Sequence, residues 1–124
     1  MKTLKVGIST YAEMKARTLA VARGEHRVAD EPRVWFTSTE SFAKVLSAGN
    51  RELLRIISET APGSIEELAQ LTGRAKSNLS RTLKTMAGYG LIRLERGERG
   101  RLAPRVNYHR VELELPIAAM PKRR

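Results

Sequence analysis

SIEELAQLTGRAKSNLSRTLKTMAGYGLIRLERGERGRLAPR, residues 64–105, is the stretch that decides the fold. Ser64 and Glu67 have the spacing of a capping box, so we expect a helix to begin there. A Thr-Gly pair that ends at Gly73 supplies a tight turn, and apolar residues at helical spacing follow it. The pattern therefore predicts two helices in succession, the second over residues 75–88.

A β-hairpin is expected after the second helix. Gly88 and Gly90 permit the left-handed backbone that ends many helices. Runs rich in strand-forming residues, 91–96 and 101–107, then flank the loop sequence GERG. We therefore expect a hairpin, called the wing below, over residues 91–107.

Positive charge is concentrated in the same stretch. Between positions 74 and 105 there are nine Lys or Arg residues and two Glu residues, a surplus of +7 in a chain of 124 residues whose net charge is +10. Such a surplus implies an acidic partner, either a nucleic acid or an anionic surface. No apolar run approaches the roughly 18–20 residues that a membrane span needs, so the membrane option is weak. Because the charge lies on a helix pair followed by a hairpin, we expect double-stranded DNA as the partner.

The helix over residues 75–88 has two unlike sides when it is projected at 100° per residue. One side is apolar and carries Leu79, Leu83 and Met86. The opposite side is polar and carries Ser77, Asn78, Arg81, Lys84 and Thr85, and the helix contains no carboxylate. A merely solvated face usually mixes charge signs to gain ion pairs one turn apart. A face of one sign favours contact with nucleic acid.

Particular contacts follow from the chemistry of these groups. Arg81 can bridge O6 and N7 of guanine, Asn78 can read adenine, and Lys84 can meet a phosphate. Arginines of the wing suit the backbone or the adjacent minor groove; the alternative for the wing is a polar tip that charge keeps soluble. The expected DNA-binding residues are Arg74, Lys76, Ser77, Asn78, Ser80, Arg81, Lys84, Thr85, Arg96, Arg99 and Arg101.

The segment 50–107 resembles the helix-turn-helix and wing of MarR-like and ArsR-like regulators. In those proteins a "Leu-Ala…Gly" helix leads into a "Ser-x-x-Ser-Arg" recognition helix and then a "Gly-Leu-Ile" start of the wing. The matching residues here are Leu68, Ala69, Gly73, Ser77, Ser80, Arg81, Gly90, Leu91 and Ile92. The resemblance implies a winged helix-turn-helix fold. One departure is Ala75, which stands where a capping Ser or Thr is common and leaves helix-start N–H groups for another partner, such as a phosphate oxygen.

The flanking segments predict an α+β chain in which the winged helix-turn-helix occupies residues 38–107. Residues 1–37 alternate as strand, helix and strand, and the stripe of the helix that follows Thr10 suits either the core or a dimer surface. Within the central part, Gly49 is expected to stop a short helix and Asn50 to cap the next one. Residues 108–124 form a last strand over 111–115 and a basic tail.

The layout outside the winged helix is similar to that of small prokaryotic DNA-binding regulators often encoded beside toxin genes. The shared features are the strand-helix start and the motif Glu31-Pro32-Arg33 before a strand. This second resemblance implies an alternative role, in which the protein is an antitoxin that binds a toxin protein and represses its own operon.

The function expected from the sequence is a DNA-binding transcriptional regulator, a repressor that occludes a promoter. One winged helix-turn-helix contacts few base pairs, so we expect a homodimer. Residues 1–37 and the last strand are the candidate interface. RNA binding through the same basic face is a further alternative. The absence of Cys and the presence of only two His argue against an enzyme, a metal site or a cofactor. The expected location is the cytoplasm.

Overall fold

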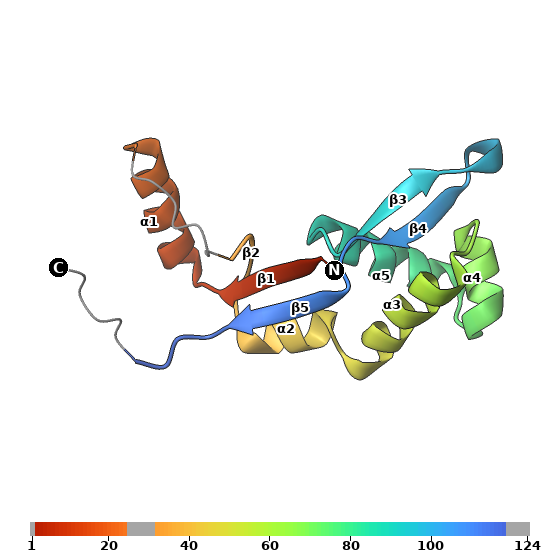
Figure 1. Ribbon diagram of the computed structural model, residues 1–124, viewed down its shortest axis with the longest axis horizontal. Coiled ribbons are helices and arrows are strands. Elements are labelled where there is room, and N and C mark those ends of the chain that lie inside the picture. Colours follow the sequence, from red (N-terminus) through yellow and green to blue (C-terminus); the bar gives the residue numbers. More distant parts are fainter. Residues whose placement is uncertain (1, 25–31, 119–124) are drawn as a thin grey trace.

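The computed structural model describes residues 2–24 and 32–118, so Glu31 and the basic end of the tail lie outside the described residues. The chain is an α+β protein (Figure 1). Its elements are β1 (Thr3–Ile8), α1 (Tyr11–Ala22), β2 (Val34–Phe36), α2 (Thr39–Val45), α3 (Ala48–Thr60), α4 (Ile65–Thr72), α5 (Lys76–Gly88), β3 (Ile92–Arg96), a short turn (Glu98–Gly100), β4 (Leu102–Val106) and β5 (Arg110–Glu114). The described helices include none that is both long and apolar enough to cross a membrane.

A three-stranded parallel sheet joins the two ends of the chain. Its order is β2-β1-β5, and Val6 of β1 lies between Val34 of β2 and Leu113 of β5. The sequence predicts each of these strands, with the last one shifted by a single residue, but not their pairing. The first and last segments of the chain therefore belong to one sheet, against which α2 packs.

Serine caps fix where three of the helices begin. Ser38, Ser47 and Ser64 each accept a hydrogen bond from the backbone N–H three residues later, at 3.0 to 3.2 Å. The capping expected at Ser64 is confirmed. The expectation that Gly49 stops a helix and Asn50 caps the next is wrong, because Ser47 is the cap. Asn50 lies in the first turn of α3 and its side-chain amide donates to the Val45 carbonyl at 3.0 Å.

The two ends of α5, the candidate recognition helix, lie within one residue of the predicted positions. It begins at Lys76, one residue later than expected, and Ala75 makes no side-chain capping bond. Gly88 remains within the helix, and Gly90 alone of the two glycines adopts a left-handed φ, of 79°. The strands β3 and β4 then pair antiparallel in a hairpin, with Ile92 opposite Val106 and Arg96 opposite Leu102.

One hydrophobic core unites the sheet with the helices. Leu79, Leu83 and Met86 of α5 are fully buried, as their spacing predicts, together with residues of α3, α4 and β3. Phe36 of β2 connects this core to the sheet. Its ring stacks on Tyr89 with centroids 4.3 Å apart and meets Phe42 edge-on at 5.3 Å.

Helix α1 stands apart from this core. It projects away from the rest of the protein (Figure 1), and none of its described side chains is buried. Tyr11 is 80% exposed and Leu19 is 48% exposed. The sequence leaves two roles for the apolar stripe of this helix, namely the core or a dimer surface. The described side chains of α1 are not part of the core of a single chain.

The close approach of β1 to β2 at Gly7 generates a stability prediction. A Cβ added at Gly7 would lie 2.5 and 2.8 Å from two ring carbons of Trp35. We expect Gly7→Ala to lower the free energy of unfolding by about 1–3 kcal/mol, the usual cost of overpacking. Urea-induced unfolding measures this loss.

The control for this prediction is Gly88→Ala. Gly88 lies in α5 with open space where a Cβ would be. Alanine is the better helix former, so this variant should gain up to about 1 kcal/mol. Equal stabilities of the two variants would contradict the tight packing of Trp35 over Gly7.

Candidate nucleic-acid interface

The turn between α4 and α5 determines which side of α5 faces solvent. Gly73 ends α4 with a left-handed φ of 72°, and its N–H donates to the Ala69 carbonyl at 2.9 Å. The chain then enters α5 so that its apolar side meets α4 and β3. The polar side predicted from the sequence is accordingly exposed, namely Ser77, Asn78, Arg81, Lys84 and Thr85, whereas Ser80 is half-buried.

Arg81 and Lys84 are the cations of this polar side. Neither makes an ion pair or a side-chain hydrogen bond with any residue that the structure describes. The Thr85 hydroxyl donates to the Arg81 carbonyl at 3.1 Å, so this hydroxyl is satisfied within its own helix. The guanidinium of Arg81 and the ammonium of Lys84 are thus the charged groups of this polar side that can bind an external anion.

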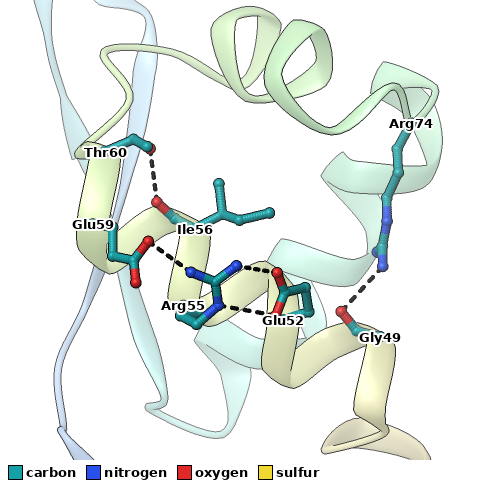
Figure 2. Close-up of polar contacts among 7 residues, drawn as sticks. All are labelled: Gly49, Glu52, Arg55, Ile56, Glu59, Thr60 and Arg74. Atoms are coloured by element: carbon teal, nitrogen blue, oxygen red, sulfur yellow. Dashed lines mark hydrogen bonds and ion pairs between the residues drawn. The ribbon is translucent and has the colours of Figure 1, made fainter.

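Arg74 has a structural contact that the sequence does not reveal. Its Nη2 donates to the carbonyl of Gly49, in the first turn of α3, at 3.1 Å (Figure 2). This bond ties the turn between α4 and α5 to the start of α3. The structure therefore separates Arg74 from the exposed cations of α5, although both were expected in the same site.

Glu66 connects α4, α5 and the hairpin, and sequence reasoning missed it. One carboxylate oxygen lies 3.4 Å from Lys76 Nζ, and the other lies 3.9 Å from Arg101 Nε. Glu66 precedes the basic stretch by eight positions, so its pairing with residues of two later elements follows only from the tertiary structure. Lys76 and Arg101, both expected to bind DNA, are partly neutralised by this shared partner.

The arginines of the hairpin fall into two groups. Arg93 binds Glu95 at 2.7 Å and Asn107 at 2.9 Å, and Arg105 donates to the Pro62 carbonyl at 2.7 Å, so both hold the hairpin in place. Arg96 and Arg99 are exposed and have no hydrogen bond or ion pair to the described residues. Arg99 lies in the turn between β3 and β4, at the tip of the hairpin, and its φ of 59° is left-handed.

The exposed face of α3 provides a contrast within the same protein. Arg55 lies between Glu52 and Glu59 and binds both carboxylates, at 2.7 Å to Glu59 (Figure 2). The hydrogen bond from Arg55 lowers the pKa of Glu52 below its usual range. Charge on this face is balanced locally, and Arg55 is occupied by carboxylates, unlike Arg81 and Lys84 on α5 and Arg96 and Arg99 near the hairpin tip.

Comparisons with known proteins add one match. A family model described as HVO_A0114 matches residues 45–113, which run from the end of α2 into β5 and contain every candidate residue above. No curated protein matches the chain. No solved structure matches it either.

The position of Glu66 leads to a prediction about its titration. Its pKa lies below the usual range, first because its own backbone N–H bonds the carboxylate and then because Lys76 and Arg101 lie nearby. Lys76→Gln should raise this pKa part of the way to its ordinary value, as NMR titration of the carboxyl would show. The folded value is the lower one, so the stabilisation is present above the unfolded pKa and is lost as the pH falls through the folded pKa.

Lys84→Gln is the matched control for the titration. It removes the same charge from α5 at a position that has no contact with Glu66, so the pKa of Glu66 should not change. If Lys76→Gln and Arg101→Gln both left the pKa of Glu66 unchanged, the link between α4, α5 and the hairpin would be wrong.

Proposed function

The chain belongs to the HVO_A0114 family, and we propose that it is a winged helix-turn-helix protein that binds double-stranded DNA and regulates transcription. The observation that carries this proposal is the distribution of cations without partners. Within the stretch 74–105, four cations have no partner among the described residues, and they lie on one helix and on the hairpin beside it: Arg81, Lys84, Arg96 and Arg99. The other basic residues of the stretch 74–105 have bonds to protein groups.

The proposed docking uses α5 as the recognition helix. At a rise of 1.5 Å per residue, its 13 residues extend about 20 Å, and the major groove of B-DNA is wide enough to admit a helix. Ser77, Asn78 and Arg81 occupy the first half of α5, the part that reads base edges in helix-turn-helix proteins. Lys84, one turn further along, is then placed for the phosphate backbone.

The start of α5 offers a second kind of contact. The first N–H groups of any helix have no partner within the helix, and Ala75 supplies no side-chain cap. A phosphate oxygen is an acceptor that fits these N–H groups, and the positive end of the helix dipole favours it. This arrangement complements the exposed cations, because it would fix the register of α5 on the duplex.

The hairpin β3–β4 acts as the wing in this proposal. Arg96 and Arg99 lie near its tip and project cations without a described partner. Arginine is favoured in the minor groove by the negative potential there, and it also binds backbone phosphates. The wing therefore contributes mainly sequence-independent affinity, and α5 contributes the base contacts.

The proposed role of binding is to block a promoter. A protein that holds one duplex segment through a helix and a wing excludes other proteins from the same grooves, so repression follows from occupancy alone. Nothing in the mechanism needs a reacting group or a cofactor. The distinction between base readout by α5 and backbone contact by the wing leads to two different expectations for variants.

Arg81→Ala tests the recognition helix. We expect it to weaken binding to the specific site by about 1–3 kcal/mol, because a bidentate contact with guanine is lost, and to leave nonspecific binding nearly unchanged. Fluorescence anisotropy with a site identified in the DNA upstream of the gene measures both affinities. Arg55→Ala is the matched control, since Arg55 is occupied by two carboxylates on α3. Specific binding that survives Arg81→Ala intact would refute the assignment of α5.

Arg99→Ala tests the wing. Loss of one phosphate contact should weaken binding to every sequence to a similar extent and reduce the slope of log K against log salt by about 1. Anisotropy titrations over a series of salt concentrations give this slope. Arg93→Ala serves as the control, because Arg93 binds Glu95 and Asn107 within the hairpin. An unchanged slope for Arg99→Ala would remove the wing from the interface.

A further inference from the structure

Strand β5 has one free side. It pairs with β1 from Arg110 opposite Thr3 to Glu114 opposite Gly7, and the order β2-β1-β5 leaves its other side without a strand among the described residues. Exposed edges are commonly protected from pairing by charged side chains, Pro or a bulge. The sequence of β5, RVELE, contains no Pro, and its register with β1 is continuous. Its three charged residues, Arg110, Glu112 and Glu114, include both signs, so they oppose some pairings of this edge and favour others.

An apolar groove runs along the same part of the protein. It has a volume of about 870 Å³ and lies between α2, α3 and the segment that leads into β5. Its apolar lining includes Phe42, Leu46, Leu54, Val106, Tyr108 and Val111. No lining residue belongs to β1 or β2, so the groove borders β5 and not the middle of the sheet.

A row of exposed apolar side chains continues from the groove along β5. Alternate residues of a strand share a face, so Leu113 lies on the same face as Val111, which lines the groove. Leu113 is 37% exposed, and Leu115 and Ile117 beyond it are 48% and 95% exposed. One end of this edge therefore offers an apolar groove and the other end offers an apolar ridge.

We propose that β5 pairs antiparallel with β5 of a second copy of this chain, about a two-fold axis at Val111. In this register Arg110 of each copy lies opposite Glu112 of the other, and the two Val111 side chains meet. Leu113 lies opposite His109 and diagonal to Val111 of the second copy, and both of those residues line the groove. The ridge of each copy thus covers the groove of the other, and the two sheets become one sheet of six strands.

The charges of β5 select this register. Opposite residues in an antiparallel pair point to the same face of the sheet. A two-fold axis perpendicular to the sheet must therefore place one residue opposite the same residue of the other copy. An axis at Arg110, Glu112 or Glu114 would place that charge against itself, and an axis at Leu113 would place Glu112 against Glu114. Only the axis at Val111 puts opposite charges together, which stabilises cross-strand pairs.

This interface goes beyond the proposed DNA binding and does not depend on it. Neither α5 nor the hairpin tip contributes a residue to β5 or to the lining of the groove, and the test measures assembly in the absence of DNA. A protein that dimerises through β5 but binds no DNA would contradict the proposed function alone. A protein that binds DNA but does not pair through β5 would contradict this inference alone.

The test exchanges charges between copies. We expect the wild-type protein to be a dimer in sedimentation velocity, and Arg110→Glu and Glu112→Arg each to raise the dissociation constant at least tenfold. An equimolar mixture of the two variants should form dimers again, because each substituted side chain then faces an opposite charge across the axis. The Arg110–Glu112 ion pair within each chain, 2.7 Å long in the wild type, remains broken in both variants. Recovery in the mixture therefore reports contacts between copies.

A second pair of variants tests the apolar contact. Leu113→Asp should raise the dissociation constant at least tenfold, whereas Leu19→Asp, at a comparably exposed position on α1, should have no effect. Circular dichroism checks that both variants remain folded. A monomeric wild type, a mixture that does not recover, or dissociation caused by Leu19→Asp and not by Leu113→Asp would each overturn the proposal.

Discussion

Burial of one side of α5 is the constraint on which the rest of the structure depends. Leu79, Leu83 and Met86 are completely enclosed between α4, α3 and β3, and a helix so fixed cannot rotate about its axis without exposing them. Exposure of each such side chain costs about 1.5–3 kcal/mol. The same burial therefore holds Arg81 and Lys84 in solvent, because they lie on the opposite side of a helix with 3.6 residues per turn.

A second set of contacts positions the hairpin against this helix. Arg105 bonds the Pro62 carbonyl at the start of α4, and Arg101 approaches Glu66 one turn later. Glu66 also approaches Lys76 at the start of α5. The cations of the basic stretch thus have two roles. Some of them hold α4, α5 and the hairpin in one arrangement, and this arrangement exposes the others to solvent.

The local features were predictable from the sequence because they depend on neighbours along the chain. The cap at Ser64, the turn at Gly73, the apolar side of α5 and the existence of the hairpin all follow from spacing, and the structure has them. The pairing of β1 with β5 was not predictable, because these strands come from opposite ends of the chain. The alternation of apolar and polar residues predicts a strand but does not indicate which strand it pairs with. The contacts of Arg74 with Gly49 and of Glu66 with Arg101 were not predictable either, because they join residues that are far apart in the sequence. Composition counts such residues as surface charge, and only the fold distinguishes a cation that has a protein partner from one that has none.

The most direct measurement of the central claim is an NMR titration of the uniformly ¹⁵N-labelled protein with a duplex of about 20 base pairs. Backbone amide shifts should change along the exposed side of α5, including Ser77 and Arg81, and at the hairpin tip around Arg99. The shifts should not change on the exposed face of α3 around Arg55, because Arg55 already binds two carboxylates. Shifts confined to α3 or to β5, or no shifts at moderate salt, would contradict the claim that burial of the apolar side of α5 presents a DNA-binding surface.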